Sequence, residues 1–284
     1  MKKALIAVLM LSCVLALSFC ESGSGKKSEP DVVFVTTPHK VVREMLKLAG
    51  VTKDDVVYDL GSGDGRIVIA AARDFGARGI GVEIDPKLIT ASVESADKAG
   101  VHERVRFVQQ DVLETDVGQA TVVALYMLPE VNKQLLPRFF NQLRPGTRVV
   151  SHRFEIGDWK PDMTLKAYGT TVYLWVIPAP VQGDWRVRLT NEKGTREYAL
   201  KLQQKYQEIS GTVKDGDKNL KVASMRLDGR DITISVADAI AGRRFQMDLE
   251  GTVQGDRIQG TALVTSPESP LPAIYSAIGE RLSR

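Results

Sequence analysis

The chain shows two kinds of apolar pattern, one after the other. Between residues 56 and 153, short apolar runs followed by turn residues alternate with segments whose apolar residues recur at helical spacing. This alternation predicts a parallel sheet with helices on both faces. From residue 181 onward, apolar and polar residues alternate one by one over about seven stretches, which predicts antiparallel strands. We therefore expect an α/β domain followed by a small all-β domain.

The pattern also gives the expected elements and their boundaries. Strands are expected at 56–60, 79–84, 105–109, 120–126 and 147–153, and helices at 65–73, 86–99 and 130–143. A turn at Gly169 separates two further strand patterns, near 163–168 and 171–177, so the sheet should end in an antiparallel hairpin. The triplet Pro178-Ala179-Pro180 breaks the chain, which places the α/β domain at 31–178 and the all-β domain at 181–284. The all-β part reads as a meander forming a barrel or sandwich, with the apolar tail 271–275 packed across it.

One stretch carries the strongest signal of chemistry, running from Val56 to Arg66 with the sequence VVYDLGSGDGR. It predicts a buried strand, a glycine turn and the start of a helix. Glycine lets the backbone approach a ligand closely, and a helix N-terminus presents free N–H groups to that ligand. The glycines lie at first, third and fifth place, whereas a dinucleotide fingerprint has them at first, third and sixth. Asp59, before the first glycine, would repel an anionic pyrophosphate and attract a cation.

Two more acidic residues follow at the ends of the next two predicted strands. Glu83 closes the strand at 79–84, and Asp111 follows the strand at 105–109. A carboxylate at the second strand end can accept both hydroxyls of a ribose. Because the carboxyl ends of parallel strands share one edge of a sheet, the three acids should lie around one ligand.

The string DLGSGDGR and the acids at three successive strand ends resemble the class I S-adenosylmethionine (SAM) methyltransferases over roughly residues 31–178. This resemblance implies a Rossmann-like seven-stranded sheet and SAM as the cofactor. The cofactor-binding residues that it implies are Thr37, Asp59, Gly61, Ser62, Gly63, Gly65, Glu83 and Asp111. In that family, the acid at the position of Asp111 takes the adenine amino group. The alternative, that the glycines only form a structural turn, does not explain the three acids.

A narrower resemblance lies in the lead-in before the first strand. The pattern D-V-x-[YF]-V-x-T-P, followed by V-V-x-x-M-L-x-L-A, is similar to bacterial relatives of the mitochondrial lysine methyltransferases that act on the ATP synthase c-subunit and the adenine nucleotide translocase. In those proteins the lead-in lies across the cofactor, which is why Thr37 is included above. The resemblance favours a protein side chain, lysine above all, as the methyl acceptor.

The acceptor side is less clearly marked. The stretch Leu125-Tyr126-Met127-Leu128-Pro129 replaces the [DN]-P-P-[YF] loop common in methyltransferases that act on bases and amides, which argues against a nucleobase substrate. Tyr126 is a candidate catalytic or pocket residue, with a strand-end core aromatic as the alternative. His152 is a possible proton acceptor because its ordinary pKa lies near neutrality, or else a hydrogen-bonded residue at the rim. Glu130 and Trp159 are weaker candidates for the pocket.

Composition limits the alternatives. A net charge of +3 over 284 residues gives no sign of a nucleic-acid partner. Both cysteines, Cys13 and Cys20, lie in the first twenty residues, and the three histidines are scattered. We therefore expect no metal site and no disulfide in the body of the protein.

The N-terminus has the pattern of a targeting segment. A basic start precedes an apolar run from Ala4 to Phe19, and a polar, glycine-rich stretch follows, so residues 1–20 read as a signal peptide or membrane anchor and 21–30 as a flexible tether. Leu17-Ser18-Phe19-Cys20 resembles a bacterial lipobox, although Phe19 stands where a small residue is usual. The expected location is membrane-associated, either exported and lipid-anchored in the cell envelope or on a cytosol-facing anchor. Export conflicts with the cytosolic origin of SAM.

Three functions remain open from the sequence. The favoured one is a SAM-dependent methyltransferase acting on a protein side chain. The second is a non-catalytic envelope lipoprotein that uses the fold to bind a nucleoside or a partner protein, and the third is a small-molecule methyltransferase. Retention of all three acids favours an enzyme, whereas the N-terminal segment favours the lipoprotein.

Overall fold

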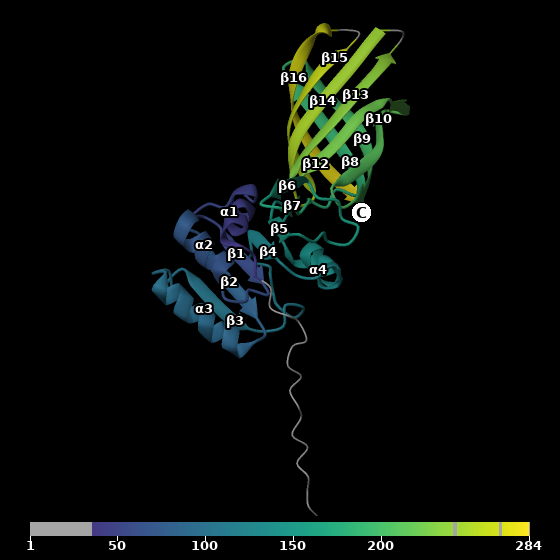
Figure 1. Cartoon of the computed structure of the whole chain (residues 1–284). Coiled ribbons are helices and arrows are strands. Elements are labelled where there is room, and N and C mark those ends of the chain that lie inside the picture. Colours follow the sequence, from purple (N-terminus) through teal and green to yellow (C-terminus); the bar gives the residue numbers. More distant parts are fainter. Residues whose placement is uncertain (1–35, 241–242, 267–268, 284) are drawn as a thin grey trace, which may run out of the picture. The chain divides into compact units, whose positions relative to one another are not determined.

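The computed structural model describes residues 36–240, 243–266 and 269–283, which form two sheets (Figure 1). The helices are α1 (His39–Leu48), α2 (Arg66–Phe75), α3 (Pro86–Lys98) and α4 (Pro129–Gln142). The first sheet contains β1 (Val56–Leu60), β2 (Arg78–Glu83), β3 (Val105–Gln109), β4 (Val122–Leu125), β5 (Arg148–His152), β6 (Met163–Ala167) and β7 (Thr170–Val176). The second contains β8 (Gly183–Asn191), β9 (Gly194–Lys205), β10 (Glu208–Asp215), β11 (Lys218–Leu220), β12 (Val222–Asp228), β13 (Asp231–Ile240), β14 (Arg243–Gln254), β15 (Arg257–Ser266) and β16 (Ser269–Ser283).

The first sheet has the strand order β3-β2-β1-β4-β5-β7-β6. The pairs from β3 to β5 are parallel, while β7 is antiparallel to both β5 and β6. The expected Rossmann-like sheet with a terminal hairpin is thus confirmed. The chain leaves β1 toward β2 on one side and returns as β4 on the other, so the strand order reverses between β1 and β4. In open sheets of this type, ligands bind at the carboxyl ends of the strands at such a reversal.

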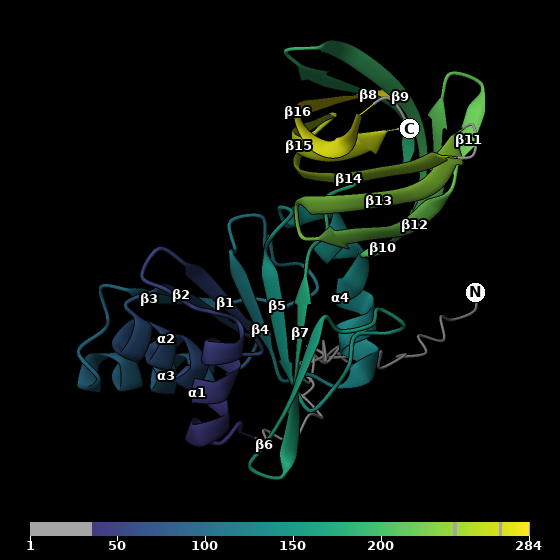
Figure 2. The same cartoon turned by 90° about the horizontal axis from the view of Figure 1, so that it is seen from above.

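Two apolar layers hold this sheet between its helices (Figure 2). Alternate residues of β1 point to opposite faces, so Val57 packs with α1 and α2 while Tyr58 and Leu60 pack with α4. The strands β4 and β5 divide in the same way. The central strands are therefore buried on both faces, which explains why their sequences are continuous apolar runs.

Most boundaries agree with the expectation to within two residues, because local signals mark them. Helix α3 begins where Asp85 accepts a hydrogen bond from the backbone N–H of Lys87 and Pro86 occupies the first turn. Helix α4 begins at Pro129. Helix α2 begins directly after Gly65, whose φ of 76° suits glycine.

The second sheet has nine strands and not about seven. The alternating residues 220–227 predict one strand, but the structure places them in two, β11 and β12. The tail expected to pack across the module is itself strand β16, which pairs with both β15 and β8. Tyr275 of this tail is buried in the core and Ala273 packs against it, whereas Leu271 and Ile274 are 77% and 71% exposed, so the tail packs through one face only. Pro270 and Pro272 hid the strand from sequence analysis, since proline usually marks a strand edge or its end.

This sheet curls until its ends meet. Its order runs from β11 through β10, β9, β8, β16, β15, β14 and β13 to β12, and β10 lies against β12 without a hydrogen-bonded ladder between them. The interior is filled by side chains such as Trp185, Tyr198 and Phe245, all at most 1% exposed. The architecture is thus a nearly closed barrel with a packed core.

Polar contacts join the barrel to the loop after β5. At the β9–β10 turn, Lys205 Nζ and the Tyr206 hydroxyl both donate to the Asp158 carboxylate, at 2.8 and 2.6 Å. These two hydrogen bonds lower the pKa of Asp158 to about 2. Trp159 Nε1 donates to Gln207 at 2.7 Å, so the indole is tied down and not open to a ligand pocket.

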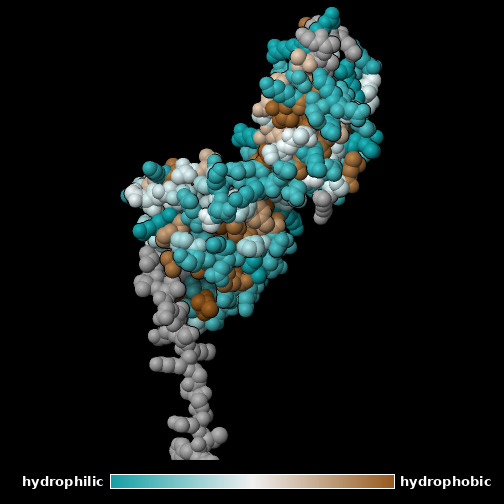
Figure 3. Space-filling model, turned by 90° about the vertical axis from the view of Figure 1, so that its right-hand side faces the viewer, coloured by the Kyte–Doolittle hydropathy of each residue, from teal (hydrophilic) through white to brown (hydrophobic). Residues whose placement is uncertain are grey.

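The described residues belong to one compact unit, so the division into domains at 178 and 181 stays a prediction. On the face drawn in Figure 3, hydrophilic side chains predominate and apolar ones form scattered groups. Within the described ranges there is no helix with the length and apolar character to cross a membrane. The predicted signal or anchor at 1–20 and the tether at 21–30 lie outside the described residues.

The glycines of the barrel give a test of its packing. A Cβ added at Gly260 would lie 1.9 Å from the carbonyl oxygen of Glu250, and this atom belongs to rigid backbone. Gly260→Ala should therefore lower the free energy of unfolding by about 1–3 kcal/mol, as overpacked sites do. Gln259→Ala, at the exposed neighbouring position of β15, serves as the control. Thermal unfolding of both variants measures the difference, and equal midpoints would contradict the close packing.

Candidate functional site

The carboxyl end of β1 holds a buried acid with no partner. Asp59 is 2% exposed, and its carboxylate receives no hydrogen bond from the described residues. Burial raises its pKa to about 8, with the nearby charges of Glu83 and Asp64 acting in the same direction. A carboxyl group held in this way is suited to a cationic group of a ligand, since a cation would favour the ionised form.

Glu83, at the end of β2, organises the backbone around it. One carboxylate oxygen accepts from the N–H of Gly63 at 2.9 Å, and the other from the N–H groups of Ile84 and Asp85 at 2.8 and 3.1 Å. The carboxylate thereby ties the glycine loop to the end of the neighbouring strand. Carboxylate oxygens have two lone-pair sites each, so capacity for a ligand hydroxyl remains.

The glycine loop itself has the backbone that its sequence demands. Gly61, Gly63 and Gly65 all have φ between 53° and 77°, a region that other residues rarely adopt. The N–H groups of Gly61 and Ser62 both donate to the carbonyl of Val82 at 2.9 Å, which holds the loop against β2. The buried Ser62 hydroxyl has no hydrogen-bond partner in the described structure. A buried unpaired hydroxyl beside an unpaired carboxyl indicates a polar ligand site.

Asp111 lies two residues beyond the end of β3. Its Oδ1 accepts from the N–H of Leu113 at 2.8 Å, which fixes the carboxylate at the start of the following turn. Strand β3 is the outer neighbour of β2, so the ends of β1, β2 and β3 follow one another along one edge of the sheet. The structure thus brings Asp59, Glu83 and Asp111 to that edge, as the sequence predicted.

On the other side of β1, the candidate residues Thr37, Tyr126 and His152 come together. The Thr37 hydroxyl lies 3.1 Å from His152 Nδ1, and both residues are at most 4% exposed. The ring of Tyr126 lies 4.2 Å from the His152 ring, centroid to centroid. His152 Nε2 lies 3.0 Å from the Thr170 hydroxyl, so both ring nitrogens are engaged.

An aromatic and apolar rim surrounds Tyr126. Its ring stacks on Phe154 at 6.1 Å with an interplanar angle of 16°. Leu128 is 50% exposed, and Arg153, between His152 and Phe154, has a φ of 70° that is strained for a residue with a side chain. Glu130 is exposed in the first turn of α4.

Four residues that shape the site were missed by sequence reasoning: Asp64, Arg66, Phe107 and Met127. Arg66 donates to the Asp64 carboxylate and to the Thr37 carbonyl, so it fastens the lead-in to the glycine loop. A Cβ on Gly61 would meet the Met127 sulfur at 2.5 Å, and one on Gly65 would meet the Phe107 ring at 2.6 Å. Met127 and Phe107 therefore lie against the loop. The signal that could have found them was their position in the sequence. Asp64 and Arg66 lie in or next to the glycine loop, Phe107 lies on β3, and Met127 follows β4.

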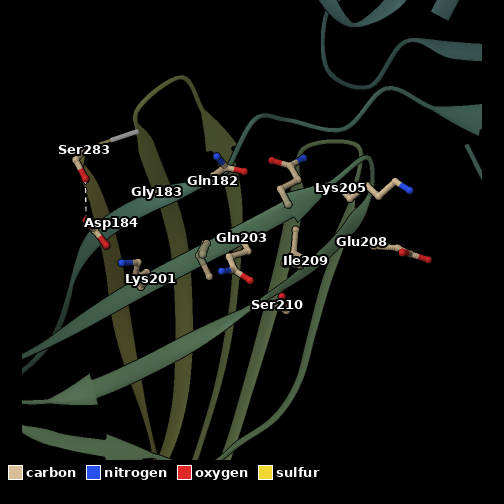
Figure 4. Close-up of a pocket in the computed structure, with 12 residues that line it drawn as sticks. Gln182, Gly183, Asp184, Lys201, Gln203, Lys205, Glu208, Ile209, Ser210 and Ser283 are labelled. Carbon is tan, nitrogen blue, oxygen red and sulfur yellow. Dashed lines mark hydrogen bonds between the residues drawn. The ribbon is translucent and has the colours of Figure 1, made fainter.

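A groove on the second sheet lies away from the candidate site residues. It has a volume of about 800 Å³ and is lined by β8–β10 residues such as Lys201, Gln203, Lys205 and Glu208 (Figure 4). None of the candidate site residues lines it. Among the described residues there is also no group of three histidine, cysteine or acidic side chains arranged to hold a metal ion.

Comparison with known proteins places the chain in a family. The model of the ANTKMT methyltransferase domain matches residues 59–163. A protein-lysine N-methyltransferase of Saccharolobus islandicus is 47% identical over 153 residues, which are 52% of this chain and 95% of that protein. A lysine N-methyltransferase of Xenopus laevis, named for the ATP synthase c-subunit, is 34% identical over 165 residues, 58% of this chain and 71% of that protein.

A solved structure gives the same assignment. The crystal structure of an RNA methyltransferase from Salinibacter ruber in complex with S-adenosyl-L-homocysteine is 56% identical, with a TM-score of 0.51. The match covers 52% of this chain and 96% of that one. The chain thus matches nearly the whole length of the Saccharolobus islandicus and Salinibacter ruber proteins, and it has the strand order and glycine loop described above. It therefore belongs to the methyltransferase family of the ANTKMT methyltransferase domain.

Proposed function

We propose that this protein is a SAM-dependent methyltransferase that transfers a methyl group to a lysine side chain of a protein. The observation that carries the proposal is the buried, unpaired Asp59 beside the glycine loop, at the point where the strand order reverses. The relative from Saccharolobus islandicus is named a protein-lysine N-methyltransferase, and it supports the acceptor class.

The residues at the edge of the first sheet fit the proposed cofactor. Asp59 would hold a cationic group, Glu83 the ribose hydroxyls and Asp111 the adenine amino group. The unpaired Ser62 hydroxyl and the glycine backbone would face the remaining polar atoms. When bound, SAM supplies an electrophilic methyl group on a sulfonium, so the protein need not create one.

The work left to the protein is to position the acceptor and exclude water from it. A lysine amine attacks only after it has lost its proton, and an apolar surrounding lowers the pKa of an amine by disfavouring its charged form. Tyr126, Phe154, Met127 and Leu128 would provide such a surrounding. The stacked rings of Tyr126 and Phe154 would also contact the aliphatic stem of the lysine.

Two other acceptors are outcomes of the tests below. The Salinibacter ruber protein is titled an RNA methyltransferase, so RNA is the first of them. A small molecule is the second. A non-catalytic protein that only binds a nucleoside is a third possibility, and turnover would exclude it.

The cofactor site is tested by Asp59→Asn. Loss of a charge-assisted contact worth roughly 1.5–3 kcal/mol should weaken SAM about tenfold or more. Because the pKa of Asp59 is about 8 in the free protein, a cation should bind more tightly as the pH rises from 6 to 8. Calorimetric titration should show this pH dependence in the wild type and not in the variant.

The control for this titration is Asp54→Asn, which changes an exposed acid in the turn before β1. It should leave both the affinity and its pH dependence unchanged. If Asp59→Asn binds SAM as tightly as the wild type at every pH, the cofactor does not contact Asp59.

The acceptor class is tested with SAM labelled on its methyl group. Incubation with separated membrane, soluble and RNA fractions of a bacterial cell should label a protein band, and acid hydrolysis should release methylated lysine. Glu83→Gln should reduce the labelling. Label that ribonuclease removes would replace the proposal with RNA methylation, and label on small molecules alone would replace it with small-molecule methylation.

We also propose that residues 1–30 attach the protein to a membrane. The support is the sequence alone, namely the apolar run 4–19 and the cysteine at its end. The wild type should sediment with membranes and incorporate labelled palmitate, whereas Cys20→Ala should lose the label. Protease protection in spheroplasts then tells which side the protein faces. A soluble full-length wild type would refute the attachment.

A further inference from the structure

His152 has no free nitrogen with which to act on a substrate. Its Nδ1 lies 3.1 Å from the Thr37 hydroxyl, and its Nε2 lies 3.0 Å from the Thr170 hydroxyl. A neutral imidazole has one N–H donor and one acceptor nitrogen, and each hydroxyl can both donate and accept. Both nitrogens are therefore used, whichever tautomer is present. To accept a proton from a substrate, the ring would first have to break one of these hydrogen bonds.

The two hydroxyls come from segments that are far apart in the sequence. Thr37 lies in the lead-in just before α1, 115 positions from His152, and Thr170 is the first residue of β7. His152 is the last residue of β5, between them. The ring thus connects the lead-in, the end of β5 and the hairpin formed by β6 and β7.

The connection continues into the glycine loop. The carbonyl of Thr37 accepts from Arg66 Nη1 at 2.9 Å, and Arg66 Nε donates to Asp64 at 2.8 Å. Asp64 lies between Gly63 and Gly65. A series of contacts therefore runs from the predicted cofactor loop, through Thr37 and His152, to Thr170. The Tyr126 ring packs against His152 at 4.2 Å.

On this geometry, and given the methyltransferase function proposed above, we propose that His152 is a positioning residue and not the proton acceptor. Its two hydrogen bonds hold the lead-in over the cofactor loop and fix the ring against which Tyr126 packs. The proton of the lysine acceptor then goes to solvent and not to His152.

The surroundings of the ring agree with this role. Burial lowers the pKa of His152, and the charge of the adjacent Arg153 lowers it further, so the surroundings favour the neutral ring. Tyr126 and Arg153 are the titratable groups that the described structure places against it. A neutral ring with one donor and one acceptor matches the two hydroxyls.

The test compares three substitutions in the full-length protein. Thr170→Val is the most informative, because the only hydrogen bond of the Thr170 hydroxyl in the described structure is the one to His152. His152→Ala removes both hydrogen bonds, and His152→Gln keeps an amide that can bond to one hydroxyl. His102→Ala changes an exposed histidine after α3 and serves as the control.

We expect Thr170→Val to weaken SAM binding about three- to tenfold, the effect of one lost hydrogen bond. Hydrogen exchange at the backbone N–H of Val42, which donates to the carbonyl of Pro38 in the lead-in at 3.0 Å, should accelerate in the same variant. His152→Ala should show both effects more strongly, and His152→Gln should recover part of the affinity. Turnover at saturating SAM and acceptor should fall less than about tenfold in His152→Gln, with an unchanged pH profile.

Two results would overturn the proposal. A general base contributes about 10²–10⁴-fold to a rate. If turnover of His152→Gln falls by that factor while SAM affinity and hydrogen exchange in the lead-in are unchanged, His152 is the general base. If Thr170→Val keeps the SAM affinity and the exchange rates of the wild type, the hydrogen bonds of His152 do not hold the lead-in in place. The exchange measurement needs neither SAM nor an acceptor, so it separates failure of this proposal from failure of the proposed function.

Discussion

The candidate site depends on one carboxylate that satisfies three backbone N–H groups. Glu83 binds the N–H of Gly63 on one oxygen and those of Ile84 and Asp85 on the other. Left-handed glycines in sequence have many alternative conformations, so a loop of this kind needs an external constraint. The Glu83 carboxylate supplies it, and the Val82 carbonyl adds two hydrogen bonds from the same strand end. The loop is thus held by β2 before any ligand arrives.

This fixed loop explains why Asp59 can stay buried without a partner. A buried carboxyl group costs free energy, and its pKa of about 8 expresses that cost. The loop backbone cannot move to pair with it, since the N–H groups of Gly61, Ser62 and Gly63 are already bonded to β2. Nearby, Gly81 leaves room for Ser62, because a Cβ there would lie 2.7 Å from the serine hydroxyl. The Asp59 carboxyl group is therefore kept from water at a cost in free energy, and binding of a cation would offset that cost.

The sequence predicted the first sheet well because each element carries its own local signal. Buried strands read as apolar runs, Pro86 and Pro129 mark helix starts, and Gly169 marks the hairpin. The acids at the strand ends followed from the rule that carboxyl ends share an edge. The bridge at His152 could not be predicted, since its partners Thr37 and Thr170 are brought together only by the completed sheet. The barrel was harder, because prolines interrupt β16 and no glycine or proline marks the break between β11 and β12.

The barrel also has a property that bears on how the protein behaves among other copies of itself. Its sheet ends at β10–β11 on one side and β12 on the other, and these edges meet without a ladder. Unpaired strand edges can recruit strands from other chains and lead to aggregation. Here β12 exposes Arg226 and Asp228, and the three-residue β11 exposes Lys218. Charge and shortness at an edge both discourage such pairing, so the barrel can stay open along one seam and still remain a separate molecule at high concentration.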